Sequence, residues 1–354
     1  MSTNFGDLET PCVLIDIDRV EANLVRAQAH ADAQGLMLRP HVKTHKLPRF
    51  AKRQLALGAV GITVQKLGEA EVMADAGLDD IFLPYNIMGA HKLARLQALN
   101  ERVTLAVTAD SPDTVAGYAK TFAVAGKPLT VLVECDTGMG RCGVQSPAQA
   151  LALARQIGMS SGLRFGGLMT YPAAGRRHEA EAWLAEAKDL LAQAGIACPV
   201  VSSGGTPDMW RDAGNRVVTE YRPGTYIYFD RSQVARGVAS WDDCALTVLA
   251  TVVSRPTATR IVIDAGSKAL TSDLLGQEGY GLVMGSDGVI VKSLSEEHGV
   301  IELAQASDTP RIGELVRIIP NHACVVSNLF DVVHLISGDT VVETLPVAAR
   351  GRVD

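Results

Sequence analysis

Lys43 lies in the part of the sequence that is richest in groups able to do chemistry. The segment reads Arg39-Pro-His-Val-Lys-Thr-His-Lys46 and follows an apolar, strand-like run. A lysine held close to other cations has a lowered pKa, and its neutral amine can form a Schiff base with an aldehyde. If the strand continues, alternation places His41, Lys43 and His45 on one face. The alternative interpretation is a solvated basic loop, and the HxKxHK context favours the reactive lysine.

Two glycine-rich stretches point to a phosphate group. Ser202-Ser-Gly-Gly-Thr206 follows a predicted strand, and Tyr221-Arg-Pro-Gly-Thr225 follows the next one. Backbone N–H groups in such a turn, together with hydroxyl groups, can surround a phosphate. Each stretch alone is equally compatible with a simple tight turn. Because the two fall at the ends of consecutive strands, together they favour a phosphate site.

A third loop carries an arginine. It reads Asp136-Thr-Gly-Met-Gly-Arg-Cys-Gly143, and its glycines allow a ligand to approach the backbone closely. Arg141 could donate a hydrogen bond to a ligand oxygen. The alternative is a structural arginine paired with Glu134 or Asp136.

His322 and Cys324 form a candidate metal pair in Pro320-Asn-His-Ala-Cys324. On a strand, residues two apart face the same way, so both side chains could bind one ion. A thiolate and an imidazole together suit Zn²⁺ best. Two ligands would leave positions open for water and substrate, as in a catalytic rather than a structural site.

These residues fall at the ends of regularly spaced strands. Eight apolar runs alternate with helical patterns rich in Ala, Leu and Glu, such as 69–76, 147–157 and 178–194. Such alternation predicts parallel βαβ units, and eight units fit a (β/α)₈ barrel better than an open sheet. No GxGxxG follows the first run, which weakens a dinucleotide-binding interpretation. The predicted strands end near residue 43 and cover 60–65, 80–85, 103–107, 129–135, 165–171, 199–203 and 217–221.

The pattern changes near Ala239-Ser240-Trp241. Runs that favour strands, punctuated by turn residues, follow from Ala245 onward. We therefore predict a barrel domain over 12–240 and a mostly antiparallel β domain over 241–354, which the N-terminal segment 1–11 joins.

Charge and composition exclude several classes of partner. The chain has 354 residues, 47% of them hydrophobic and 20% charged, with a formal net charge of −6. An acidic chain argues against nucleic acid or an anionic membrane as the main partner. No run of about 18 apolar residues suggests a membrane span, and the start lacks the features of a signal peptide. Six scattered cysteines without a CxxC pair fit a reduced, cytoplasmic setting.

Five motifs in this order resemble one enzyme family. They are His41-Val-Lys-Thr-His-Lys46, Gly138-Met-Gly-Arg-Cys-Gly143, Ser203-Gly-Gly-Thr206, Asp264-Ala-Gly-Ser-Lys268 and Pro320-Asn-His-Ala-Cys324. Together they resemble the D-threonine aldolase and D-serine dehydratase family of fold-type III enzymes, which carry pyridoxal 5′-phosphate (PLP) on a barrel of the alanine-racemase type. The resemblance covers nearly the whole chain.

The resemblance implies a role for each group of residues. Lys43 would carry PLP as a Schiff base, with Arg141 near the ring oxygen and Tyr171 near the ring, and these three make up the predicted catalytic set. We add His41 and Gln65 to the cofactor site because they follow the first two strands. The resemblance also implies a homodimer and a divalent metal (Zn²⁺, Mn²⁺ or Mg²⁺) on His322 and Cys324. The residues expected around the phosphate are Ser203, Gly204, Gly205, Thr206, Tyr221 and Gly224.

The chemistry expected is cleavage of β-hydroxy D-amino acids. PLP acts as an electron sink at Cα, and a metal on the β-hydroxyl lowers its pKa. Loss of the hydroxyl proton breaks Cα–Cβ and gives glycine and an aldehyde. Loss of the Cα proton and of hydroxide gives a 2-oxo acid and ammonia instead. His-x-Cys is typical of the dehydratase type, whereas the Thr-His-Lys context and short chain favour the aldolase. Tyr171 is followed by Pro-Ala-Ala-Gly rather than by the histidine-bearing loop of well-known members. His178 could replace that histidine as a base, and the alternative is that it begins an exposed helix.

Three further classes remain as alternatives. An amino-acid racemase would use two bases and no metal. A non-catalytic PLP-binding barrel would generally lack the second domain, against which residues 241–354 count. A metal-only barrel hydrolase would need a fuller set of His and Asp ligands at the strand ends than the sequence offers.

Overall fold

The computed structural model describes residues 3–210 and 217–354. The chain forms two compact units. The barrel unit comprises Ala27–Lys43, Leu47–Gly224 and Arg352–Asp354, and the β unit comprises Met1–Arg26, Thr44–Lys46 and Thr225–Gly351. Among the residues described, no helix is both long enough and apolar enough to cross a membrane.

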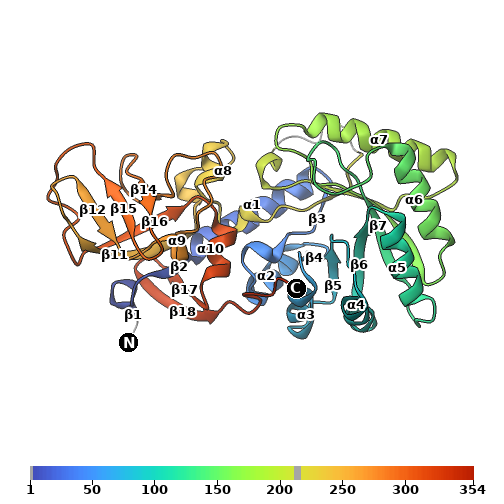
Figure 1. Cartoon of the computed structure of the whole chain (residues 1–354), viewed down its shortest axis with the longest axis horizontal. Helices are drawn as coiled ribbons and strands as arrows, with labels where there is room; N and C mark the ends of the chain where they lie inside the picture. The colour runs from blue at the N-terminus through green and yellow to red at the C-terminus, as the bar shows by residue number, and fades with distance from the viewer. Residues whose placement is uncertain (1–2, 211–216) are drawn as a thin grey trace. The chain divides into compact units, whose positions relative to one another are not determined.

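The barrel unit contains the eight parallel strands that the sequence predicts (Figure 1). Their order is β3-β10-β9-β8-β7-β6-β5-β4, and every neighbouring pair is parallel. A parallel bridge between His41 and Thr63 joins the two ends of this order, which closes the sheet into a barrel. The strands are β3 (Met37–Leu38), β4 (Ile62–Thr63), β5 (Asp80–Leu83), β6 (Thr104–Ala109), β7 (Leu129–Glu134), β8 (Leu163–Met169), β9 (Val200–Ser203) and β10 (Glu220–Tyr221).

Helices connect these strands, as the apolar periodicity predicts. Two of them begin with a serine cap followed by proline: the Ser111 and Ser146 side chains accept from the N–H groups of Thr114 and Gln149, each at 3.3 Å. Proline is tolerated at the first helical position because its missing N–H would have no partner there. The helices are α2 (Pro48–Leu57), α3 (Leu67–Asp75), α4 (Ala90–Arg102), α5 (Pro112–Phe122), α6 (Pro147–Met159) and α7 (Arg177–Gln193).

The first strand of the barrel is shorter than predicted and does not reach Lys43. Strand β3 ends at Leu38, and Val42–Thr44 form a 3-10 turn. His41, Lys43 and His45 therefore do not alternate along one strand face. His45 packs with the β unit instead of the barrel unit.

The β unit is built on one large, mostly antiparallel sheet, as expected for the C-terminal part of the chain. Strand β11 pairs antiparallel with β2, β12 and β16, and β17 pairs with β18. Its strands are β1 (Thr3–Asn4), β2 (Cys12–Asp16), β11 (Leu246–Ser254), β12 (Arg260–Ile263), β13 (Gly281–Val283), β14 (Val291–Leu294), β15 (Gly299–Glu302), β16 (Leu315–Pro320), β17 (Val332–Ser337) and β18 (Thr340–Pro346). Its short helices are α8 (Arg231–Ala235), α9 (Ser267–Leu270) and α10 (Ala323–Leu329).

The units divide at other points than the boundary we expected near residue 240. Strand β2 lies between β11 and β17 of the β unit, pairing antiparallel with the first and parallel with the second. Helix α1 (Ile17–Ala33) follows it and spans the change of unit at Arg26. On the C-terminal side, residues 225–240 also pack with the β unit. Strand β1 joins the same sheet through β18.

Candidate active site

His41, Lys43 and Gln65 form a hydrogen-bonded group in the barrel unit. The Gln65 carbonyl oxygen lies 3.1 Å from His41 Nε2 and 3.4 Å from Lys43 Nζ. His41 Nδ1 accepts from the Lys43 backbone N–H at 3.4 Å. Because that oxygen can only accept, His41 carries its proton on Nε2 and is neutral. Burial, followed by the neighbouring Lys43 charge, lowers the pKa of His41 well below its ordinary value of 6.5.

This arrangement gives the Lys43 side chain a defined direction. The amide oxygen of Gln65 is shared between the imidazole and the ammonium group, so the three side chains are placed together. A neutral imidazole beside Lys43 adds no positive charge of its own. The structure thus brings together three residues that the sequence placed in the cofactor site, including the amine expected to form the Schiff base.

The segment Ser203–Thr206 lies between two tyrosine rings. A Cβ on Gly204 would lie 2.0 Å from the Tyr221 ring, and one on Gly205 would lie 2.9 Å from the Tyr171 ring. The Tyr221 hydroxyl donates to the Gly205 carbonyl at 2.9 Å. Burial of this phenol raises its pKa, so it remains a donor. The loop can hold this path only with glycine at position 204, where φ is +97° and the contact is closest.

The hydroxyl groups at both ends of this loop suit a phosphate. Ser203 ends β9, Thr206 follows the two glycines, and both side chains are buried. Gly224 lies just beyond β10, the strand that supplies Tyr221. Hydroxyl groups, backbone N–H groups and a close backbone approach are what a phosphate group requires, so this set fits the PLP phosphate.

The loop that carries Arg141 is organised by Asp136. The Asp136 carboxylate accepts from the N–H groups of Gly138 and Gly140, both at 3.0 Å. Although burial acts in the opposite direction, these N–H groups lower the pKa of Asp136. The Arg141 guanidinium lies 5.4 Å from the centre of the Tyr171 ring. Arg141 and Tyr171, which we assigned to the cofactor ring, therefore lie close to each other.

His322 and Cys324 come together in the β unit, although not for the reason we gave. Strand β16 ends at Pro320, and His322 caps α10, in whose first turn Cys324 lies. The prediction that both lie on a strand is wrong. The two side chains nevertheless lie near each other, since the His322 imidazole lowers the pKa of the Cys324 thiol.

Further groups in the β unit complete the surroundings of this pair. The Cys324 sulfur lies 3.1 Å from the Thr44 hydroxyl and 3.5 Å from the Thr225 hydroxyl, and His322 Nδ1 lies 2.7 Å from Asp273 Oδ2. Burial opposes ionisation of Cys324, but the neighbouring His322 imidazole and the two threonine hydroxyls outweigh it and lower the thiol pKa. Within residues 3–210 and 217–354, no three His, Cys, Asp or Glu side chains form a complete metal cage. A sulfur and an imidazole with open sides fit a metal that also binds substrate.

Comparison with known proteins gives the family. The model described as "Alanine racemase, N-terminal domain" matches residues 15–232, which is more than half of the chain. The model described as "Putative serine dehydratase domain" matches residues 245–336. The protein belongs to the alanine racemase N-terminal-domain family. The match spans the barrel strands and the site residues from His41 to Gly224.

Full-length relatives of this family member place it more narrowly. It is 34% identical to a D-threonine aldolase of Arthrobacter sp, covering 97% of this chain and 93% of the relative. It is also 34% identical to a D-threo-3-hydroxyaspartate dehydratase of Delftia sp. (strain HT23), covering 95% and 96%. The crystal structure of a D-threonine aldolase from Filomicrobium marinum superimposes with a TM-score of 0.88 at 34% identity, covering 100% of this chain and 99% of the other.

Sequence reasoning missed Arg222 in this family member. Its guanidinium is buried, donates to the Ser202 hydroxyl at 2.7 Å and to the Thr170 carbonyl at 2.5 Å, and lies 5.7 Å from the Phe82 ring centre. Burial lowers the pKa of Arg222 to about 10. Of Tyr221-Arg-Pro-Gly224, we assigned only the tyrosine and the glycine to the site. The sequence feature that could have drawn attention to Arg222 is its position between the end of a predicted strand and Pro223.

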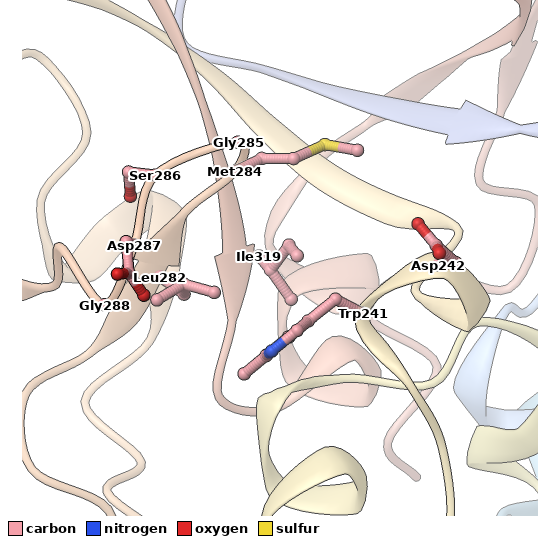
Figure 2. A pocket seen from close by; sticks show the side chains of 9 residues that line it. All are labelled: Trp241, Asp242, Leu282, Met284, Gly285, Ser286, Asp287, Gly288 and Ile319. Atoms are coloured by element: carbon pink, nitrogen blue, oxygen red, sulfur yellow. The ribbon is translucent and has the colours of Figure 1, made fainter.

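The β unit of this family member also holds a cavity of about 490 Å³, shown in Figure 2. Trp241, Leu282 and Ile319 line it together with the turn Met284–Gly288 and Asp242. None of the residues that we assigned to the cofactor or the metal lines this cavity. Its carboxylates belong to Asp242 and Asp287, which are both exposed.

Proposed function

We propose that the protein is a PLP- and divalent-metal-dependent lyase that cleaves β-hydroxy D-amino acids by a retro-aldol reaction. The D-threonine aldolases among its relatives support this proposal at 34% identity over nearly the whole chain. The observation that carries it is the presence of two reactive groups in one chain: Lys43 held by Gln65 in the barrel unit, and the His322–Cys324 pair in the β unit.

Each residue of the barrel unit then has a part. Bound PLP would act as the electron sink for charge developing at Cα. Lys43 supplies the amine, and Gln65 directs it. His41 remains neutral, and its Nε2–H group donates a hydrogen bond to the Gln65 oxygen. Arg141 would face the cofactor ring beside Tyr171, and Ser203 with Thr206 would bind the phosphate.

The β unit would act on the β-hydroxyl of the substrate. A divalent metal on His322 and Cys324 would lower the pKa of that hydroxyl and favour cleavage of Cα–Cβ. The Thr44 hydroxyl, which also belongs to the β unit, lies 3.1 Å from the Cys324 sulfur and adds a polar group beside this pair. A solved cysteine-to-alanine variant of a D-threo-3-hydroxyaspartate dehydratase, with a TM-score of 0.89 and 33% identity, is described as being in the metal-free form. Zn²⁺ is the metal that this donor pair favours, with Mn²⁺ and Mg²⁺ as alternatives.

A dehydratase is the second candidate, and one observation favours it. The chain has cysteine rather than aspartate two residues after His322, and the Delftia sp. dehydratase is as similar to it as the Arthrobacter sp aldolase. Cleavage and elimination begin from the same bound substrate and differ in which bond breaks. His178 is a poor general base for either reaction, because it is exposed near the start of α7.

The test is product analysis with two substrates. Purified protein is incubated with PLP, a divalent metal and either D-threonine or D-threo-3-hydroxyaspartate, and the products are identified by NMR. Glycine with acetaldehyde or glyoxylate would support the aldolase. A 2-oxo acid with ammonia would replace it by the dehydratase. Turnover of neither substrate, with PLP and metal both bound, would contradict the proposal. Homodimerisation and a cytoplasmic location stay predictions.

A further inference from the structure

Asp273 makes the closest polar contact of His322. The carboxylate oxygen Oδ2 lies 2.7 Å from His322 Nδ1, and both residues belong to the β unit. A carboxylate accepts but cannot donate, so Nδ1 carries the proton that faces Asp273. The nitrogen left with a free electron pair in the neutral ring is Nε2. This tautomer is the one required if His322 is to bind a metal beside the Cys324 sulfur.

The loop that carries Asp273 is fixed by Asn321, the residue before His322. The Asn321 amide group is fully buried and donates to the carbonyls of Asp273 at 3.1 Å, Leu274 at 3.4 Å and Gly279 at 2.8 Å. Its own oxygen accepts from Arg231 Nη1 at 3.1 Å. The Asn321 side chain thus joins the backbone of the Asp273 loop to the segment that carries His322, which restricts movement of one relative to the other.

Backbone strain is concentrated in the same place. Thr271 has a φ of 65° and Leu275 a φ of 49°, and they lie two residues before and two residues after Asp273. Residues other than glycine rarely adopt positive φ, and a β-branched residue does so least readily. Such strain persists only where the surroundings impose it, often at functional sites. The Asp273 loop is therefore held in one conformation against its local preference.

The segment between His322 and Cys324 is held as well. The Ala323 N–H donates to Asp230 Oδ2 at 3.0 Å, and the Asp230 carboxylate is fully buried. The other oxygen of Asp230 accepts from the Ser232 hydroxyl at 2.6 Å. Both sides of the His322–Cys324 pair are therefore anchored: Asn321 and Asp273 on the imidazole side, and Asp230 at the residue between the two.

We propose that Asp273 is a positioning residue of the metal site, which fixes the ring orientation and the Nε2-free tautomer of His322. The inference rests on the proposed function, because it assumes a metal on His322 and Cys324. Carboxylates that accept from the second nitrogen of a metal-binding histidine raise its basicity and orient it, and removing such a partner lowers metal affinity about 10- to 100-fold. We expect a loss of this size when Asp273 is replaced, while the ligands themselves stay in place.

The experiment compares Asp273→Asn, Asp273→Ala and His322→Ala in the full-length, PLP-loaded protein. Zinc affinity is measured by competition with a coloured chelator, and Co²⁺ binding by its visible absorption. Asn can still accept from Nδ1 but carries no charge, so affinity should fall in the order Asp, Asn, Ala. The Co²⁺ spectrum of Asp273→Asn should keep its sulfur-to-metal band and change its ligand-field bands. Asp331→Asn is the matched control, because that exposed carboxylate also accepts from one partner, Arg350, at 2.9 Å.

Each outcome decides between explanations. Affinity in Asp273→Asn and Asp273→Ala equal to that of Asp331→Asn would refute the positioning role. A loss as complete as that of His322→Ala would make Asp273 a direct ligand and would also refute it. A wild-type protein that takes up PLP but binds neither Zn²⁺ nor Co²⁺ would contradict the metal part of the proposed function, and the inference with it. Retained PLP colour in every variant shows that the barrel is intact.

Discussion

Gly204→Ala tests whether the loop beside Tyr221 has the geometry that PLP binding requires. The Gly204 backbone has a φ of +97°, and an added Cβ would lie 2.0, 2.2 and 2.4 Å from three atoms of the Tyr221 ring. Ordinary carbon contacts begin at about 3.4 Å, so the ring would have to move by more than an ångström. The ring is buried and its hydroxyl is bonded to the Gly205 carbonyl at 2.9 Å, which leaves it little freedom.

The expected cost has two parts. A non-glycine residue at positive φ costs about 1–3 kcal/mol. Overpacking against a fixed ring costs about 1–3 kcal/mol more. If the loop stays in place, the loss appears as a lower free energy of unfolding. If the loop moves aside, it appears as weaker PLP binding, where 1–3 kcal/mol corresponds to about 5- to 150-fold. The sum of the two losses should therefore be about 2–6 kcal/mol.

Gly77→Ala is the matched control for this prediction. Gly77 lies in the same unit at a φ of +86°, but a Cβ there would meet no atom within 4 Å. It should show the backbone cost alone. Urea unfolding of the PLP-free protein and PLP titration followed by absorbance measure the two losses for both variants. If Gly204→Ala loses no more than Gly77→Ala in either measurement, the contact between the loop and Tyr221 does not exist as described.

Three further predictions concern the same two groups of residues. His41→Gln should make the protein less sensitive to acid, because the pKa of His41 is lower in the folded than in the unfolded protein. The stability that neutral His41 contributes is present above about pH 6.5 and is lost as the pH falls, by up to about 1.4 kcal/mol per pH unit. Replacement of the exposed His178 by glutamine is the control and should leave acid unfolding like that of the wild type. Lys43→Ala should remove the yellow colour of bound PLP and Lys66→Ala should not, as read by absorbance; equal colour in both would exclude Lys43 as the attachment point. Chelation of the metal should abolish substrate cleavage and leave PLP bound, measured as product and colour in one sample, and undiminished cleavage after complete metal removal would contradict the metal role.

The sequence by itself determined the barrel. Eight apolar runs separated by amphipathic stretches predict eight parallel strands, because each run is a strand buried on both faces and each connection is long enough for a helix. All eight strands occur where the sequence places them, with ends that differ by a few residues. The motifs at their carboxyl ends could also be read in advance, since parallel strands bring those ends to the same edge. This rule made Lys43, Gln65 and Ser203 candidates, and the resemblance to a known family gave Lys43 and Ser203 their expected roles.

Only the tertiary structure decided which unit each end of the barrel sequence joins. Strand β2 has the same apolar character as the barrel strands, yet Leu14 pairs with Thr247 and His334 in the β unit. Nothing local distinguishes a buried strand of one sheet from that of another. The choice depends on partners more than 200 residues away, which a periodicity does not contain.

The tertiary structure also decided the surroundings of the reactive groups. Asp273 meets His322 across 49 residues of sequence, and Arg222 is buried against Ser202 and Thr170. Hydrogen bonds between side chains on different elements depend on how those elements pack, so no spacing predicts them. The sequence identified which residue types could do the chemistry. The packing of the β unit brought the Asp273 carboxylate to Nδ1 of His322, so Nε2 is the ring nitrogen that does not face this carboxylate.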